Sequence, residues 1–433
     1  MNRARRPTRS PLVRMLSPLR DFLATESAGA LLIAAGAVAA LAWANSPWSG
    51  SYESFWSSRI SIGVAGHTLD LDLRHWLNDG LMTFFFLVVG LEIKREVVDG
   101  HLTNKRAAAL PMVAALGGMV VPALVYLAIA GGTAPRGWAI PMATDIALAL
   151  GILAVAGTRL PSSLRAFLLG LAIVDDIGAI LIIAAVYSSG LEWEWLAAAM
   201  LALVAVIGIR RFGVHALGAY VLLGSVVWFA LHEAGVHPTL AGVALGLLAP
   251  SVPRLQSQYI DVDELADVSS VEAAHATTEL ARGSVSVVEW LQYVLHPWTS
   301  YLIVPLFALA NAGIEISGPG LREAIGSPIA WGVFAGLLLG KPLGVVAAVL
   351  ISVRSGATDV PDGARPVQVL GIGAAAGIGF TVAIFITELA LTDPAQRASA
   401  KLAILVASLL AAMMSAVLLR LTPPAGRQSV STD

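Results

Sequence analysis

Long apolar stretches make up most of this 433-residue chain, and short polar clusters separate them. An α-helix needs roughly 20 mainly apolar residues to cross a bilayer, and most of the stretches approach that length. We therefore predict an all-α polytopic membrane protein with about twelve transmembrane helices, or about eleven or thirteen given the short and glycine-rich stretches. The predicted spans are residues 27–44, 77–93, 107–130, 138–156, 164–187, 195–209, 215–232, 237–250, 298–314, 329–351, 367–391 and 398–421.

The basic residues are distributed unevenly between the two sets of loops. Loops on the side of the N-terminus hold 20 of the 27 Lys and Arg, the opposite loops hold six, and Lys341 lies inside a span. Because cytoplasmic loops are enriched in Lys and Arg, we expect a membrane domain over 27–421 between cytoplasmic segments 1–26 and 422–433. The first apolar run ends Ala42-Trp43-Ala44, which has the small-x-small pattern of a signal-peptide cleavage site. The eleven further spans favour a first helix that is kept in the protein and not cleaved off.

Two of the loops have patterns of their own. Residues 59–73 alternate between apolar and polar around Ala65-Gly66-His67, which predicts a β-hairpin outside the membrane. Two arrangements fit the unpaired edge of this hairpin. The hairpin either pairs with a second copy of the chain or lies flat on its own protein. Residues 251–296 form the longest polar stretch and are acidic. We expect a cytoplasmic loop there, part amphipathic helix and part disordered, with a solvated acidic face.

The composition agrees with a membrane protein and excludes several chemistries. The chain is 57% hydrophobic and 13% charged, with a mean hydropathy of +0.77, which is too apolar for a soluble globular protein. It contains no cysteine, so disulfides, thiolate nucleophiles and cysteine-ligated metals are excluded. The net charge of −2 gives no indication of nucleic-acid binding. No bound cofactor is expected.

Span 164–187 carries two adjacent carboxylates, Asp175 and Asp176, near its middle. At ~1.5 Å per residue they lie roughly 17 Å from its start, close to the bilayer midplane. An acid at that depth costs about 2.5–3.5 kcal/mol on insertion scales, which indicates a functional site more than a purely structural ion pair. Neighbours on a helix point about 100° apart, so the two acids cannot both face one small site squarely.

Two other spans are expected to be interrupted helices. In 138–156, Pro141 removes a backbone donor just before Thr144-Asp145. The alternative is a simple proline kink with Asp145 capping a half-helix, and such a cap is compatible with a role in an ion site. In 367–391, four closely spaced glycines weaken the helix, with tight helix packing as the alternative. These spans run in opposite directions in corresponding halves, as in transporters with inverted-topology repeats.

Lys341 lies near the middle of span 329–351 and needs a partner within the membrane. The candidate partners are Asp145, Asp175 and Asp176. The glycines before Lys341 do not form a phosphate-binding loop, because their spacing differs and no hydroxyl residue follows the lysine.

Buried carboxylates of this kind suit the exchange of protons for a hard cation. Their oxygens prefer hard cations to soft metals, and burial of a carboxylate also favours its protonated form. An acid that is ionised to hold a cation and protonated when the cation leaves exchanges H⁺ for that cation at one site. The sequence has no ATP-binding motif, so an ion gradient must supply the energy.

Three other functions fit the sequence less well. An intramembrane aspartyl protease needs an acid on each of two helices flanking a water, but Asp145, the other mid-span acid, lies beside a predicted break. A proton-coupled carrier of another small solute is the main alternative, although an anionic solute would have only Lys341 as a cationic group. A passive channel would not need titratable ligands.

The motifs together resemble the NhaA-type Na⁺/H⁺ antiporter family over roughly residues 20–420. The matching stretches are FFLVVGLEIKRE at 85–96, ATDIA at 143–147, VDDIGA at 174–179, GVHPTLAG at 235–242, LHPW at 295–298, FALANAG at 307–313, GKPLG at 340–344 and GIGFT at 377–381. The resemblance implies a pH-regulated, electrogenic antiporter in the bacterial inner membrane, a secondary transporter and not an enzyme. It would export Na⁺ or Li⁺, with two H⁺ moving inward per Na⁺. The family is itself an example of the inverted-repeat architecture, so the two expectations are not independent.

The resemblance also implies roles for residues at the site. Asp176 resembles the primary Na⁺ and Li⁺ carboxylate, with Asp175 beside it and paired to Lys341 when the site is empty. Asp145 and Lys341 resemble the residues that compensate half-helix dipoles where two extended chains cross. Thr144 resembles an accessory ligand. By the same resemblance, the hairpin would join two copies into a homodimer.

A further group of residues resembles the family's regulatory positions. Glu92, Glu96, Asp99 and His237 match or neighbour positions of a cytoplasmic pH-sensing entrance, and Asp79 matches an intramembrane acid near the periplasmic side. His237 precedes a proline and is equally suited to beginning a helix.

The chain departs from the family at the stretch before His-Pro-Trp, where Gln292-Tyr293 replace an acidic–basic pair, and at Asp99, which replaces a longer Glu. The loop 251–296 is also longer and more acidic than the family leads us to expect. These departures concern the pH dependence and leave the expected core chemistry unchanged.

Overall fold

The computed structural model describes residues 26–64, 67–100, 103, 105–156, 161–188, 190–214, 216–252, 285–360 and 364–421. Nearly all of the segment 1–26, the whole of 422–433 and residues 253–284 of the acidic stretch lie outside this part of the chain. The elements are, in chain order, α2 (Glu26–Ala44), α3 (Ser49–Trp56), β1 (Arg59–Val64), β2 (His67–Asp72), α4 (Leu73–His75), η1 (Trp76–Leu81), α5 (Met82–Val98), α6 (Lys105–Ala130), η3 (Pro135–Met142), α7 (Ile146–Ala156), α8 (Ser162–Val186), α9 (Trp193–Arg211), α10 (Leu217–Glu233), α11 (Leu240–Leu248), α13 (Val287–Trp298), η5 (Thr299–Ile303), α14 (Val304–Asn311), α15 (Gly318–Gly326), α16 (Pro328–Ala335), η6 (Gly336–Gly340), α17 (Lys341–Arg354), α18 (Pro366–Ala376), α19 (Phe380–Ala390) and α20 (Pro394–Arg420).

Each of the twelve predicted apolar stretches coincides with helix in the structure. By length and apolar composition, seven helices of the described part can cross a bilayer, or nine if each of two bent helix pairs is one span. Helices α10 and α11 are shorter, with 17 and 9 residues. A polytopic helical membrane architecture is therefore confirmed, whereas twelve spans remain a prediction.

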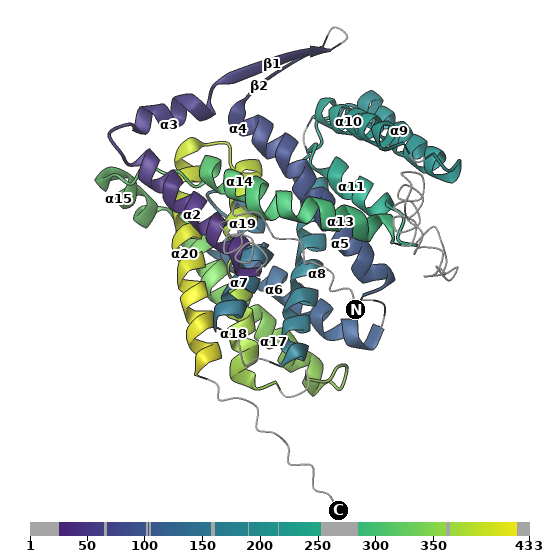
Figure 1. Cartoon of the computed structure of the whole chain (residues 1–433). Helices are drawn as coiled ribbons and strands as arrows, with labels where there is room; N and C mark the ends of the chain where they lie inside the picture. Colours follow the sequence, from purple (N-terminus) through teal and green to yellow (C-terminus); the bar gives the residue numbers. More distant parts are fainter. Residues whose placement is uncertain are drawn as a thin grey trace, which may run out of the picture.

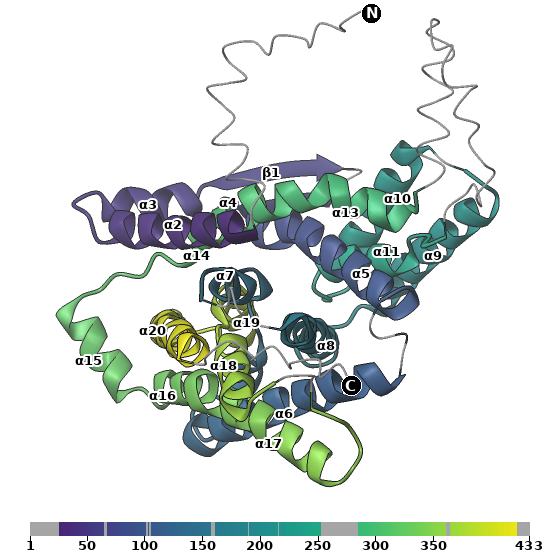
Figure 2. The same ribbon diagram turned by 60° about the horizontal axis from the view of Figure 1, so that its bottom comes forward.

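The helices form two layers, which Figure 2 shows one above the other. One layer contains α2, α14, α13, α5 and α11, with α9 and α10 at its end, and the other contains α6, α7, α8 and α16 to α20 (Figures 1 and 2). Within the layers, α11 packs along α5, α2 along α14, α17 along α6 and α18 along α20. The layers touch where α2 meets α7, α5 meets α8 and α14 meets α19.

Both predicted helix interruptions are present, and the two broken helices cross. The 3₁₀ helix η3 ends at Met142, residues 143–145 are extended, and α7 continues the span. Helix α18 ends at Ala376, and α19 leaves it at an angle of 46°. Helix α19 packs on η3, and α18 packs on α7. The first half of each broken helix thus lies beside the second half of the other, so the two helices run in opposite directions.

The predicted hairpin at 59–73 is also present, and it projects from one end of the helix layers (Figure 1). Strands β1 and β2 pair antiparallel, with Arg59 opposite Asp72 and Ile62 opposite Leu69. Hydrogen bonds from Ser61 and Arg59 hold the pKa of the Asp70 carboxyl below its ordinary value. We call the end of the molecule from which the hairpin projects the hairpin end.

The structure differs from the sequence prediction in three places. Helix α13 begins at Val287, inside the predicted acidic loop, because Ser286 and Glu289 form a capping box. It continues through the π-helical segment η5 into α14, so the helix there starts well before residue 298. Helix α20 begins at Pro394, before the predicted span 398–421, so Arg397 lies within the helix. Helices α3 and α15 were not predicted, because both are short and largely polar.

Candidate functional site

The backbones of the two broken helices are joined directly at their crossing. The Asp145 amide donates to the Ile378 carbonyl over 2.7 Å, and the Thr144 hydroxyl donates to the Ala376 carbonyl over 3.0 Å. Glycine permits this close approach, since a Cβ atom on Gly379 would lie 3.1 Å from the Ala143 carbonyl oxygen. These bonds satisfy part of the backbone that the helix breaks leave open inside an apolar protein.

Asp145 caps two half-helices at once. Its Oδ1 accepts a hydrogen bond from the Leu148 amide in the first turn of α7, over 3.1 Å. Its Oδ2 accepts from the amide of Thr381 over 3.1 Å and from the Thr381 hydroxyl over 2.5 Å, at the start of α19. Helix N-termini carry partial positive charge, so this carboxylate offsets the dipoles of both. In this structure Asp145 therefore caps a half-helix on each side of the crossing.

Lys341 occupies the complementary position beside a helix C-terminus. Its ammonium donates to the carbonyl of Met142, the last residue of η3, and to Oδ2 of Asp175. The side chain is completely buried, and the π-helical segment η6 immediately before it sets its position on the span. Of the three candidate partners, the structure pairs Lys341 with Asp175.

Asp175 and Asp176 have different surroundings although they are adjacent on α8. Oδ2 of Asp175 also accepts a hydrogen bond from the Thr144 hydroxyl over 2.6 Å, and the single proton of that hydroxyl is shared with the Ala376 carbonyl. Oδ1 of Asp175 is buried and has no partner among the described residues. Asp176 is buried as well, at 7% exposure, and no hydrogen bond or ion pair in the described part of the chain involves its carboxylate. Its charged neighbours are Asp175, Glu92, Lys341 and Asp145.

This arrangement provides hard oxygen ligands for a small cation. Asp175 and Asp176 are adjacent on α8, Oδ1 of Asp175 has no partner among the described residues, and its Oδ2 accepts a hydrogen bond from the Thr144 hydroxyl. A carboxylate without partners in such a place is costly unless it binds a proton or a cation. The chemistry of the two acids is therefore suited to binding either H⁺ or a hard cation. Asp145 takes no part in an acid dyad, because both of its oxygens accept hydrogen bonds from the backbone and from Thr381.

The predicted entrance residues on α5 lie beyond this site, away from the hairpin end. Glu92 is half-buried and close enough to Asp176 for their charges to interact. Glu96 is buried one turn further along, at 5% exposure, and Asp99 is exposed at the end of the helix. The three side chains therefore follow α5 from its exposed end toward Asp176.

The structure does not bring His237 to these three acids. Helices α5 and α11 run in parallel, because Gly242 lies against Thr83 and Gly246 lies against Gly90. His237 precedes α11 and so lies at the start of α5, on the hairpin side, whereas the acids lie at its end. This placement separates His237 from the entrance to which the resemblance assigned it.

Asp79 is found at the hairpin end as well, in the π-helical segment η1. Its backbone carbonyl accepts hydrogen bonds from the Thr83 hydroxyl over 2.5 Å and from Nε1 of Trp228 over 2.9 Å. The Trp228 ring stacks between Trp76 and His232. Asp79 therefore lies beside an aromatic stack and apart from the two central acids.

Sequence reasoning missed two features of this region. Thr381 was noted only as part of a motif, yet it binds Asp145 through two groups. Glu388, in the last turn of α19, forms ion pairs with Arg397 and Lys401. An acid within span 367–391, followed by two basic residues at the start of the next span, was the pattern that would have revealed this cluster.

The comparisons with known proteins agree with the geometry. A family model described as Na⁺/H⁺ antiporter 1 matches residues 20–419. The chain is 44% identical to Na⁺/H⁺ antiporter NhaA 3 of Frankia alni, over 93% of this chain and 88% of that protein. It is 44% identical to Na⁺/H⁺ antiporter NhaA of Oleidesulfovibrio alaskensis, over 95% of both chains. The NhaA of a Janthinobacterium species is 43% identical over 93% of this chain and 92% of its own length.

Proposed function

This chain belongs to the NhaA family of Na⁺/H⁺ antiporters, and from this premise we propose how its residues perform the exchange. It is a secondary transporter of Na⁺ and H⁺, and not an enzyme. Asp176 binds the cation, Asp175 supplies a second carboxylate, and Thr144 supplies an accessory oxygen. The observation that carries this assignment is the pair of adjacent acids at the helix crossing, of which one is bound to Lys341 and the other is open.

One cation and the protons compete for the same groups. When Na⁺ enters, the Asp176 carboxylate must be ionised and the ammonium of Lys341 must release Asp175. When Na⁺ leaves, Asp176 takes up a proton and the ion pair between Asp175 and Lys341 forms again. If Lys341 releases a proton while the pair is open, two protons move for each Na⁺ and transport is electrogenic. Li⁺, a smaller hard cation, suits the same oxygens.

The same premise extends to the arrangement in the membrane. We propose twelve spans, inverted-topology repeats and both termini on the cytoplasmic side of a bacterial inner membrane. The antiparallel crossing of the broken helices supports the inverted repeats, and the uneven distribution of Lys and Arg supports the orientation. The hairpin end is then periplasmic. Its exposed Ile60 and Ile62 support a homodimer formed through the hairpin.

Regulation by pH involves titratable groups at both ends of the molecule. Glu92, Glu96 and Asp99 line the cytoplasmic approach to Asp176, so their charges change the local concentration of cations and protons. Asp79 and His237, which precedes α11, lie at the periplasmic end instead, and His237 is the group there that senses pH.

The experiment uses everted membrane vesicles and a dye that reports the pH difference. Asp176→Asn removes the charge of the proposed ligand with little change in shape. We expect Na⁺-dependent dissipation of the pH gradient to be lost while membrane insertion stays intact. The matched control is Glu194→Gln, an exposed acid on α9 far from the site, which should exchange like the unmodified protein. Normal exchange by Asp176→Asn would overturn the assignment.

A further inference from the structure

Helix α15 connects the two helix layers at the hairpin end and lies at the outer edge of the molecule. It follows α14, which belongs to one layer, and precedes α16, which belongs to the other. Figures 1 and 2 both show it beside α20, outside the stacked helices. Helix α15 packs on α20 and α16, and Ala324 is its one buried residue. Most of its remaining surface therefore faces the surroundings of the protein.

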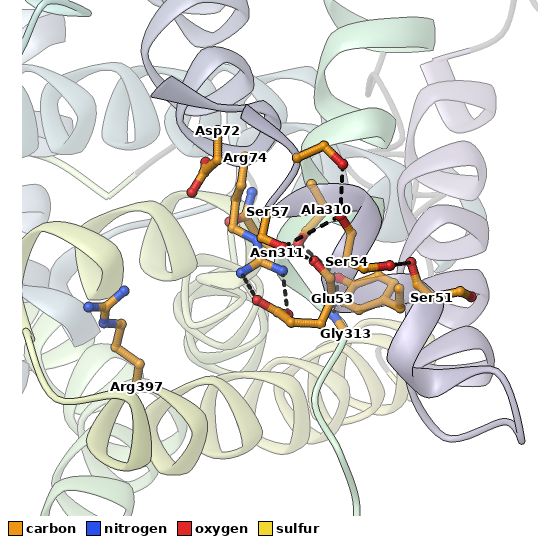
Figure 3. A network of polar contacts seen from close by, with 12 residues as sticks. Ser51, Glu53, Ser54, Ser57, Asp72, Arg74, Ala310, Asn311, Gly313 and Arg397 are labelled. Atoms are coloured by element: carbon orange, nitrogen blue, oxygen red, sulfur yellow. Dashed lines mark hydrogen bonds and ion pairs between the residues drawn. The ribbon is translucent and has the colours of Figure 1, made fainter. Parts of the chain in front are cut away.

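The chain that leads into α15 is held to the first layer by side chains of α3 and of the turn after α2. The Tyr52 hydroxyl accepts a hydrogen bond from the Gly313 amide over 3.2 Å, and Figure 3 shows Gly313 beside α3. The Asn45 side chain donates to the Ile314 carbonyl over 2.8 Å and accepts from the Ile316 amide over 2.6 Å. These bonds fix the backbone just before α15, so contacts with both layers set the position of the helix.

The two sides of α15 differ in polarity. Successive residues of an α-helix point about 100° apart, so directions can be counted from Ala324, the buried residue that faces α20. Leu321 and Ile325 then point about 60° and 100° to one side, and Glu323 points about 100° to the other. Leu321 and Ile325 are 45% and 60% exposed. Helix α15 is therefore amphipathic, with an exposed apolar side opposite an exposed acid.

Trp331 shows at which level of the membrane this helix lies. It belongs to the first turn of α16, at the start of the apolar stretch Pro328–Arg354, which is long enough to cross a bilayer. Its Nε1 donates to the Ile325 carbonyl over 2.8 Å, and the residue is 51% exposed. Tryptophan is enriched where the hydrocarbon core meets water, and the exposed Leu339 and Leu343 lie further along the same span. The end of α15 is therefore at the boundary between hydrocarbon and water.

The surroundings of the apolar side are then either lipid or a second copy of the chain. A stable protein interface buries roughly 800 Å² on each partner, and the few exposed apolar side chains of this short helix provide much less than that. An amphipathic helix beside the end of a membrane span suits the lipid interface, where its apolar side enters the acyl region and its polar side stays in water. The geometry thus favours lipid.

We propose that α15 lies in the membrane interface at the hairpin end and anchors the connection between the two helix layers to lipid. Leu321, Ile325 and Trp331 contact the acyl chains just below the headgroups. Glu323 faces water, and Arg322, which points almost directly away from α20, reaches the phosphates of the headgroups. The inference requires that the chain crosses a bilayer, and it does not depend on which ions are carried.

The test uses single cysteines, because the chain contains none of its own. Leu321→Cys, Glu323→Cys and Ile325→Cys each receive a nitroxide spin label and are reconstituted in phosphatidylcholine vesicles. Power saturation of the electron paramagnetic resonance signal compares collisions with oxygen, which concentrates in hydrocarbon, and with a water-soluble nickel chelate. Leu409→Cys, 63% exposed in the middle of α20, is the reference for lipid. Val360→Cys, 41% exposed in the loop after α17, is the reference for water.

We expect the ratio of oxygen to nickel collisions to be several-fold higher for Leu321→Cys and Ile325→Cys than for Glu323→Cys, because only the first two labels enter the acyl region. Equal ratios at all three positions would overturn the proposal, since α15 would then lie wholly in water or wholly in hydrocarbon, as the two references show. Low collision rates with both reagents at Leu321→Cys and Ile325→Cys would also overturn it, because a protein surface and not lipid would then cover this side.

Folding is followed by size-exclusion chromatography of each labelled variant. If Leu321→Cys fails to fold, the comparison of Ile325→Cys with Glu323→Cys decides, since Ile325 is the more exposed of the two apolar residues. The collision measurement needs no transport. A failure of the Asp176 assignment would therefore show in the exchange assay and leave the result for α15 unaffected.

Discussion

Replacing Lys341 by methionine tests the pairing at the centre of the site. The change removes the ammonium while keeping a similar length, so Asp175 keeps only the hydrogen bond from Thr144. Removing one partner of a buried ion pair costs about 3–5 kcal/mol, because the remaining charge is left uncompensated. Both side chains are completely buried here, so solvent cannot reduce this cost.

The expected loss of thermal stability follows from the size of the chain. At ~2.1 cal/mol/K of unfolding entropy per residue, a cost of this size lowers the midpoint of a roughly 400-residue protein by about 5 °C. The assay is thermal unfolding of the purified protein in detergent, followed by the loss of the monodisperse chromatographic peak. The matched control is Arg354→Met, which removes an exposed cation from the other end of the same helix.

The double variant Asp175→Asn with Lys341→Met makes the test specific to the pair. Neither buried charge remains, so most of the lost stability should return. Neither variant is expected to exchange Na⁺ normally. The reasoning would be refuted if Lys341→Met were as stable as the parent, or if the double variant were less stable than Lys341→Met.

Three further predictions concern the helix crossing and the coupling. Gly377→Ala would place a Cβ atom 2.6 Å from the Leu337 carbonyl oxygen, so we expect a loss of about 1–3 kcal/mol and slower exchange. Gly208→Ala, which meets no atom within 4 Å, should not destabilise α9, and equal unfolding midpoints for the two variants would contradict the close packing. Thr381→Val removes a 2.5 Å hydrogen bond to Asp145 worth about 1.5–3 kcal/mol. Its initial rate of exchange should fall below that of Thr387→Val, which loses only a bond within its own helix. If two protons move per Na⁺, a membrane potential imposed with valinomycin and K⁺ should change the exchange rate, and indifference to it would exclude electrogenic transport.

The sequence predicted where the apolar helices lie better than it predicted the lengths of these helices and the contacts between them. Pro141 and the glycines of span 367–391 predicted the broken helices, since they weaken a helix wherever they occur. The alternation of apolar and polar residues in 59–73 predicted the hairpin, because this pattern too depends only on neighbouring residues. The partner of Lys341 was not decidable from the residues alone, because all three acids lie at similar depth. Only the crossing of the broken helices brings Met142 and Asp175 to the ammonium.

Other features depend on contacts that a one-dimensional pattern does not contain. The π-helical segments before Met82, Val304 and Lys341 have no distinguishing composition. His237 was grouped with the acids of α5 by resemblance, whereas the parallel packing of α5 and α11 separates them. The ion pairs of Glu388 were not predicted, because its partner Arg397 precedes the predicted span 398–421, and only the structure shows that α20 begins at Pro394.

The most direct measurement is the binding of radioactive sodium to the purified, unmodified protein across a series of pH values. If Na⁺ and H⁺ compete for Asp176, the apparent affinity for Na⁺ should weaken as the medium is acidified. Once the free site is mainly protonated, we expect about a tenfold loss of affinity per pH unit for each proton displaced. An affinity that stays constant down to acidic pH would contradict the competition, and with it the proposed mechanism.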